Sequence, residues 1–129
     1  MPKSIKITTW NVNSVKARLP NILAWLKEAT PDVVLLQELK CVDENCPRIE
    51  MGVAGYNIKT HGQKTYNGVA ILSKSPIEDV KCGLPGDTND EQARYMEGTV
   101  FGKLRVASLY LPNGNPISSD KFKYKLAWM

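Results

Sequence analysis

Hydrophobic and polar positions alternate at the start of the chain and then change period. Residues 5–10 (Ile-Lys-Ile-Thr-Thr-Trp) alternate with period two and are rich in β-formers, which predicts a strand. The next apolar positions have helical spacing and predict a helix with Ser14 as its N-cap: Val15, Leu19, Ile22, Leu23 and Leu26. The helix should stop at Thr30-Pro31, because the residue before a proline is pushed out of the α region.

A short continuous apolar run follows over residues 32–37 (Asp-Val-Val-Leu-Leu-Gln). Such runs are typical of strands that are buried on both faces, usually parallel ones in a layered fold. Strand, helix and buried strand together predict a βαβ unit with a right-handed crossover. Both strands then end at the same edge of the sheet, and Asn11 and Glu38 are the polar residues immediately past those ends.

Beyond this unit the sequence is mostly β in character. Residues 40–55 contain Asn, Pro and Gly and predict a loop with a short helix. Strands are expected at 56–59, 68–72, 78–81, 95–101 and 104–111, with a hairpin over 100–106 whose two-residue loop is Gly102-Lys103. Ser118-Ser119-Asp120 and the apolar spacing after it predict a helix that is cut partway at Met129.

Composition and charge narrow the class of protein. The 129 residues suit one domain over 1–129, and 43% hydrophobic with 23% charged residues is ordinary globular usage. No stretch approaches the ~18 apolar residues of a membrane span, and no signal core opens the chain, so we expect a cytoplasmic protein without a membrane partner. The net charge of +4 permits a polyanionic partner but does not identify one.

The cysteines are few and odd in number. Cys41, Cys46 and Cys82 do not make the even, dense set of a secreted disulfide scaffold, so the thiols are expected to be reduced. A structural zinc site needs four ligands, usually in two close pairs, and His61 is the only histidine. His61 is therefore expected to be a surface loop residue, neither a zinc ligand nor a general base.

Four motifs appear in order along the chain: Asn11-Val12-Asn13-Ser14-Val15-Lys16-Ala17-Arg18-Leu19, Leu36-Gln37-Glu38-Leu39-Lys40, Tyr66-Asn67-Gly68-Val69-Ala70-Ile71-Leu72-Ser73 and Leu109-Tyr110-Leu111-Pro112-Asn113-Gly114. Together they resemble the exonuclease III family of abasic-site endonucleases, in the endonuclease/exonuclease/phosphatase (DNase I-like) superfamily. The resemblance covers essentially the whole chain but only roughly the first half of a family member. It implies an α/β fold, the N-terminal half of a four-layer sandwich in which two sheets pack face to face.

The resemblance also implies a metal site. Glu38 matches the family's acidic ligand for a divalent cation, and Asn11 matches its amide neighbour. The implied cofactor is Mg²⁺, with Mn²⁺ as an alternative; Mg²⁺ prefers oxygen ligands and keeps several waters, which leaves room for a substrate phosphate. Without the motifs, Glu38 would be a surface carboxylate at a strand end and Asn11 a turn former.

Tyr110 matches the family's active-site tyrosine, whose hydroxyl can donate to a phosphate oxygen. Without the motif it would be an ordinary half-buried tyrosine with an exposed hydroxyl. The remaining polar residues of the motif loops are expected to contact phosphate or to support the site: Asn13, Arg18, Lys40, Lys64, Tyr66, Asn67 and Asn113.

The function implied is a Mg²⁺-dependent DNA-repair phosphodiesterase that acts on duplex DNA at abasic sites or 3′ ends. The family's water-activating aspartate and its Asp-His pair come from the second half, and their motifs do not occur here. We therefore expect little or no activity from this chain alone, a bare apolar sheet face and, as a partner, the missing C-terminal half. The alternatives are a non-catalytic remnant that binds DNA or a partner, and a superfamily phosphatase or phosphodiesterase with another substrate.

Overall fold

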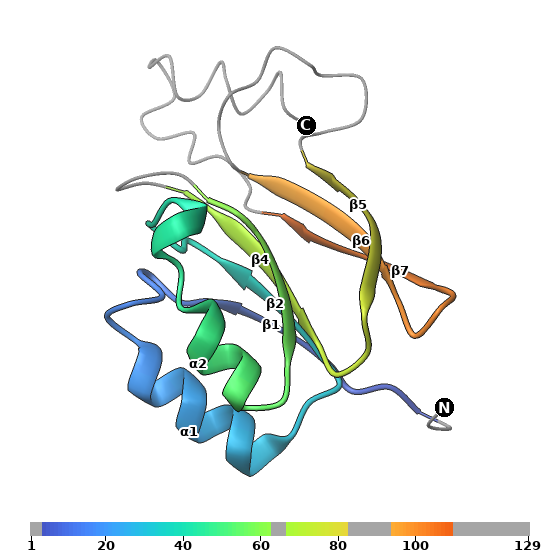
Figure 1. The fold of residues 1–129 in the computed structure, drawn as a ribbon, viewed down its shortest axis with the longest axis horizontal. Helices are drawn as coiled ribbons and strands as arrows, with labels where there is room; N and C mark the ends of the chain where they lie inside the picture. Colours follow the sequence, from blue (N-terminus) through green and yellow to red (C-terminus); the bar gives the residue numbers. More distant parts are fainter. Residues whose placement is uncertain (1–3, 63–66, 83–93, 110–129) are drawn as a thin grey trace, which may run out of the picture.

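Two β-sheets and two short helices make up the part of the chain that the structure describes. The structure is a computed structural model that describes residues 4–62, 67–82 and 94–109. Its elements, in chain order, are β1 (Ile7–Asn11), α1 (Leu19–Ala29), β2 (Val33–Gln37), a 3-10 turn η1 (Asp43–Asn45), α2 (Arg48–Val53), β3 (Asn57–His61), β4 (Val69–Ser73), β5 (Ile77–Cys82), β6 (Tyr95–Val100) and β7 (Leu104–Leu109). Figure 1 shows α1 and α2 on one side of β1, β2 and β4, with β5, β6 and β7 on the other.

The first sheet has the strand order β1-β2-β4-β3. β1 and β2 are parallel, with Ile7 opposite Val33 and Asn11 opposite Gln37, and α1 connects them. This confirms the predicted strand, helix and buried parallel strand. β4 lies antiparallel between β2 and β3, so the sheet is mixed.

Helix α1 begins later than the hydrophobic spacing predicts. It starts at Leu19, next to Pro20, which is favoured in the first helical turn, and residues 15–18 form turns. The N-cap of α1 is Arg18, so the predicted cap at Ser14 is wrong for this helix. Ser14 has a φ of 85°, and its hydroxyl accepts from the N–H of Ala17 at 3.3 Å, within the turn that precedes α1. The predicted stop is confirmed, because the helix ends at Ala29 and Thr30 adopts a left-handed conformation before Pro31.

The second sheet is antiparallel, with the order β5-β6-β7. Val100 pairs with Leu104, so the β6–β7 loop has three residues, 101–103, and the prediction of a two-residue Gly102-Lys103 loop is wrong. The reason is local: Phe101 and Gly102 both have positive φ, at 52° and 74°, and the N–H of Lys103 then bonds to the carbonyl of Val100 at 3.3 Å.

Alternation along β2 and β4 divides the core into two layers. Val34, Leu36, Ala70 and Leu72 belong to the cluster under the helices, where they meet Ile22, Leu26 and Met51. Val33, Val69 and Ile71 belong to the other cluster, which they form with Ile77, Met96, Val100 and Val106 of the second sheet. The two sheets therefore pack face to face, as predicted.

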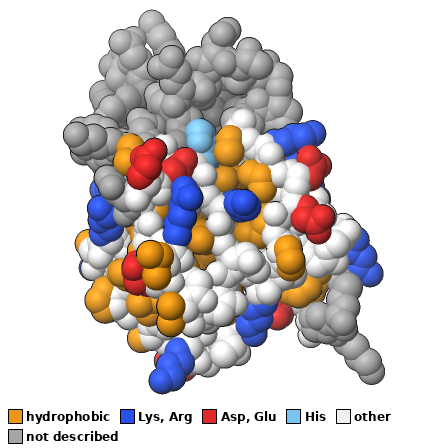
Figure 2. Space-filling view, viewed as in Figure 1, with side chains coloured by type: hydrophobic (Ala, Val, Ile, Leu, Met, Phe, Trp, Pro, Cys, Tyr) orange, Lys and Arg blue, Asp and Glu red, His pale blue; other side chains and the backbone are white. Residues whose placement is uncertain are grey.

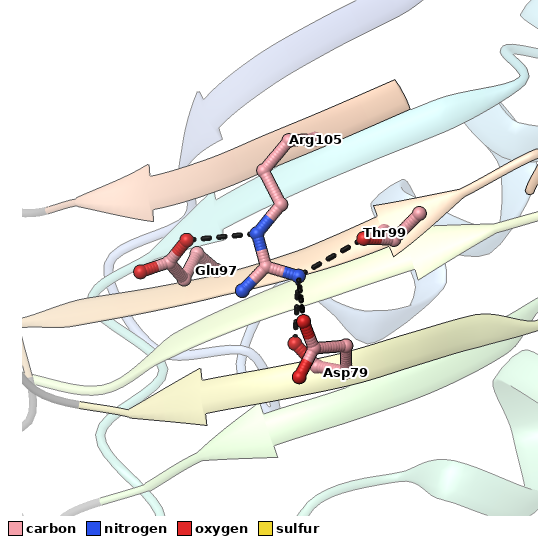
Figure 3. A network of polar contacts seen from close by, with 4 residues as sticks. All are labelled: Asp79, Glu97, Thr99 and Arg105. Carbon is pink, nitrogen blue, oxygen red and sulfur yellow. Dashed lines mark hydrogen bonds and ion pairs between the residues drawn. The ribbon is translucent and has the colours of Figure 1, made fainter. Parts of the chain in front are cut away.

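A network of polar side chains crosses the outer face of the second sheet. Arg105 donates to Glu97 at 2.8 Å, to Thr99 at 3.0 Å and to the carbonyl of Asp79 at 2.7 Å, and so ties β7, β6 and β5 together (Figure 3). The residues that alternate outward on β6 and β7 also include Tyr95, Ala107 and Leu109, of which Leu109 is 47% exposed. The expected bare apolar sheet face therefore stays a prediction.

Cys41 and Cys46 form a disulfide, and Cys82 is free and exposed. The expectation of reduced thiols is therefore wrong for this pair. The turn η1 folds the loop back and brings the two Cα atoms to 6.0 Å, within the range that a disulfide can span. Among the described elements, no helix has the length and apolar content needed to cross a membrane.

A candidate cation site at the rim of the first sheet

The loops that follow β1 and β2 run side by side. Asn11 is the last residue of β1 and lies opposite Gln37, the last residue of β2, so Glu38 follows one position later at the same end of the sheet. The pairing continues past the strands, because the N–H of Ser14 donates to the carbonyl of Glu38 at 2.8 Å. We call this end of the first sheet the rim.

A third segment, the residues just before β4, closes the rim. The N–H of Leu39 donates to the carbonyl of Gly68 at 3.2 Å, and the N–H of Lys40 donates to the carbonyl of Asn67 at 2.9 Å. Gly68 has a φ of 97°, and a Cβ there would lie 2.9 Å from the Cβ of Leu39. This close approach requires glycine, and it holds the main chain beside Glu38 in place.

Polar side chains at the rim are linked through Lys40. Its Nζ donates to Oδ1 of Asn13 at 2.6 Å and lies 4.0 Å from Oε2 of Glu38, whose side chain is only 19% exposed. The N–H of Asn13 in turn donates to Oδ1 of Asn11 at 3.2 Å. The structure thus brings four residues predicted from the motifs into one group, with Asn67 adjoining it through the main chain.

Left-handed backbone conformations concentrate at this rim. Eight non-glycine residues in the described part of the chain have positive φ, which is uncommon for residues with a Cβ. Five of the eight belong to the rim loops: Asn13, Ser14, Glu38, Lys40 and Asn67. Strained conformations persist where surrounding contacts hold them, and they cluster at functional sites, so we interpret the rim as such a site.

The oxygen atoms of the rim suit a hard cation. In the described residues no three His, Cys, Asp or Glu side chains converge, so the donor set is one carboxylate and neutral oxygens. Mg²⁺ is commonly held by one or two carboxylates while it keeps several waters. The amide oxygen of Asn11 accepts one N–H and has a second lone pair. The Lys40 ammonium beside Glu38 balances part of the negative charge of this carboxylate.

Other predicted residues lie elsewhere or outside the described ranges. Arg18 is exposed at the N-cap position of α1, and no contact in the described part of the chain joins its side chain to Glu38 or Lys40. His61 is the last residue of β3, opposite Val69, so its predicted loop position is wrong; β3 extends to pair with the whole of β4. The following predicted residues lie outside the described residues: Lys64, Tyr66, Tyr110 and Asn113.

The positive charge of the chain is not gathered on the face shown in Figure 2. Lys and Arg side chains are interspersed with Asp and Glu over the described part of that face, and hydrophobic side chains gather over the helix layer. The exposed apolar residues of α2, Ile49 and Val53, belong to this layer.

One residue that supports the rim, Gln37, lies in the second motif but is not among the site residues predicted from the sequence. Gln37 is 9% exposed, and its side chain makes hydrogen bonds to β1 in its own sheet and to β7 in the second sheet. Its signal in the sequence is that it shares the period-two alternation of Val33 and Leu35, so a polar side chain stands at a position that faces the second sheet.

Comparison with known proteins gives a consistent result. The model of the Endonuclease/Exonuclease/phosphatase family matches residues 8–127. Exodeoxyribonuclease III of Haemophilus influenzae is 36% identical over 113 residues, which cover 85% of this chain and 42% of that protein. The structure of the 3′ phosphatase NExo from Neisseria, bound to a product DNA hairpin, has a TM-score of 0.93 and 46% identity, and covers 97% of this chain and 48% of that one.

The structure of an AP endonuclease from Archaeoglobus fulgidus has a TM-score of 0.90 and 39% identity, with coverage of 97% of this chain and 48% of that one. The chain thus spans less than half the length of each of these three proteins.

Proposed function

This chain belongs to the Endonuclease/Exonuclease/phosphatase family, and on that basis we propose that its rim holds the divalent cation of an exonuclease III-type DNA-repair phosphodiesterase. The proposed substrate is duplex DNA with abasic sites or 3′ ends, and the proposed location is cytoplasmic. The names of its relatives, an exodeoxyribonuclease III and an AP endonuclease, support this substrate class. The observation that carries the proposal is the grouping of Asn11, Asn13, Glu38 and Lys40 at one rim.

Each residue has a proposed role. A divalent cation, when bound, neutralises phosphate charge and makes the phosphorus easier to attack. Glu38 and Asn11 would hold it through their oxygens, a donor set that suits Mg²⁺ and also Mn²⁺. Lys40 would present its ammonium to a phosphate oxygen of the DNA backbone. Tyr110 follows β7 by one residue in the sequence, and its hydroxyl would donate to a non-bridging phosphate oxygen.

This chain supplies only some of the groups that the proposed reaction needs. Phosphodiester hydrolysis also needs an oriented water and a proton acceptor. The family motifs that carry these groups do not occur in the sequence. We therefore expect weak incision of abasic DNA by these 129 residues alone, and we propose the C-terminal half of a family member as the partner that completes the site.

A second candidate is removal of a phosphate from a DNA 3′ end. The observation that favours it is the 46% identity to a protein described as a 3′ phosphatase. The same rim would hold the cation in both reactions, so the two candidates differ in the substrate and not in the residues proposed here. Release of inorganic phosphate from a 3′-phosphorylated duplex, compared with incision of an abasic duplex, would distinguish them.

The proposed function is tested by measuring the affinity of the chain for a DNA duplex that contains an abasic-site analogue. Fluorescence anisotropy at constant ionic strength gives this affinity. We expect Mg²⁺ to tighten binding several-fold in the unmodified chain and to have no effect in Glu38→Gln. Glu28→Gln is the matched control, because Glu28 is exposed and lies away from the rim, near the C-terminal end of α1. The next residue, Ala29, accepts a hydrogen bond from Lys6, which precedes β1 at the end of the sheet opposite the rim. Equal Mg²⁺ effects in the two variants would refute the proposal.

A further inference from the structure

A polar bridge interrupts the apolar contact between the two sheets. The Nε2 of Gln37 donates to the hydroxyl of Ser108 at 3.1 Å, and that hydroxyl donates to the carbonyl of Leu36 at 2.8 Å. Ser108 is 1% exposed, so both hydrogen bonds lie in the interior. The bridge therefore joins the end of β2 to β7, across 71 residues of sequence.

The same glutamine also reaches β1. Its Nε2 lies 3.0 Å from the hydroxyl of Thr9, which in turn lies 3.3 Å from Oε1 of Gln37, so the two side chains form a reciprocal pair. The carbonyl of Leu35 also lies 3.1 Å from Nε2, so its two N–H groups are shared among three acceptors. This one side chain connects three strands, two in the first sheet and one in the second.

Stability alone does not explain a polar bridge at this position. Nearby, the two sheets meet through apolar side chains such as Val33, Ile71 and Val106. Replacement of both partners of a buried hydrogen bond by apolar groups of the same shape can be nearly neutral for stability, or stabilising. Apolar contacts, however, tolerate small sliding movements, whereas hydrogen bonds weaken steeply when distance or angle changes. The bridge therefore fixes the offset between the two sheets at this end.

The bridge lies directly beneath the rim. Gln37 is paired with Asn11 and precedes Glu38, while Ser108 precedes Tyr110 by two residues. We propose that Gln37 and Ser108 are positioning residues that align Asn11 and Glu38 with the end of β7. This inference rests on the proposed function and extends it to residues that touch neither cation nor substrate.

Two substitutions remove the bridge, and a third substitution serves as the matched control. Ser108→Ala deletes the hydroxyl, and Gln37→Met keeps the length of the side chain without its donors. Val106→Ala is the control, because Val106 lies two residues earlier on the same inward face of β7 and is also buried. Urea unfolding first establishes that each variant folds and that the control loses a similar amount of stability.

The readout is the alignment of the rim. In two-dimensional NMR spectra without metal, we expect the amide signals of residues 11–13 and 38–40 to shift in Ser108→Ala and Gln37→Met and to stay in place in Val106→Ala. Mn²⁺ affinity, measured from the EPR signal of free Mn²⁺, should fall about three- to tenfold in the two bridge variants only, and Ser108→Thr, which keeps the hydroxyl, should recover part of it.

The outcomes separate the two proposals. Unchanged rim signals in both bridge variants, or equal shifts in Val106→Ala, overturn the positioning role. If the unmodified chain does not bind Mn²⁺, the proposed cation site at the rim is refuted. The metal-free NMR spectra still decide whether the bridge aligns the rim residues.

Discussion

Replacement of Gly68 by alanine should lower the free energy of unfolding by more than the cost of an unfavourable backbone conformation alone. Gly68 has a φ of 97°, and a Cβ there would lie 2.9 Å from Cβ and 3.4 Å from the backbone N of Leu39. A left-handed conformation costs a residue with a Cβ about 1–2 kcal/mol. Forced overpacking costs a further ~1–3 kcal/mol, so Gly68→Ala should lose about 2–5 kcal/mol of unfolding free energy. That loss is a large part of the ~5–15 kcal/mol that holds a typical domain together.

Gly55→Ala separates the two contributions to this loss. Gly55 has a φ of 96°, almost the same as Gly68, but an added Cβ would find no atom within 4 Å. Its replacement should therefore cost only the ~1–2 kcal/mol of the left-handed conformation. Urea unfolding followed by far-UV circular dichroism measures both variants under the same conditions. If Gly68→Ala loses no more stability than Gly55→Ala, the close contact with Leu39 does not constrain the rim and the reasoning is wrong.

Two further predictions concern residues away from the rim. Burial, reinforced by Asp32, raises the pKa of Tyr56 above its usual 10.0, and its hydroxyl donates to the carbonyl of Pro31 at 2.6 Å. The unfolded tyrosine therefore loses its proton first, so stability should fall as pH rises above about 10, and Tyr56→Phe should lessen that fall in urea unfolding between about pH 8 and 11. Arg105→Met removes the contacts of Figure 3, but the side chain is 34% exposed, so we expect a loss of only about 0.5–1.5 kcal/mol by thermal unfolding. A loss above about 3 kcal/mol would mean that this surface network matters more than its exposure allows.

The parts of the fold that depend on local pattern could be predicted from the sequence. The apolar run 33–37 is bounded by Pro31 and Glu38, and its continuity alone indicates a strand covered on both faces. The parallel pairing with β1 follows from the helix between them. The four motifs indicate the family and the DNase I-like fold, which the family match and the TM-scores confirm.

Features that depend on distant contacts could not be predicted in the same way. Val15 continues the apolar spacing of α1 but lies in a turn, because its N–H bonds to the carbonyl of Leu39 instead of to a helical carbonyl. The Cys41–Cys46 disulfide depends on how η1 folds the loop. Gln37 gains its partner from a strand that begins 67 residues later, at Leu104.

The candidate site shows the same division. Parallel strands place Asn11 and Glu38 at one rim, and this part follows from the predicted βαβ unit. The contact between Lys40 and Asn13 does not follow from it, because it depends on left-handed conformations at Asn13 and Lys40 that no local pattern specifies. The role of Asn11 and Glu38 in holding a cation stays a prediction.

The most direct test of that prediction is paramagnetic broadening of NMR signals by a small amount of Mn²⁺, compared between the unmodified chain and Glu38→Gln. The account predicts that the side-chain amide of Asn11 and the backbone amides near residues 11–13 and 38–40 broaden first, and that Glu38→Gln abolishes this effect. Broadening centred on the acidic residues at η1 and α2, Asp43, Glu44 and Glu50, or an unchanged pattern in Glu38→Gln, would contradict it.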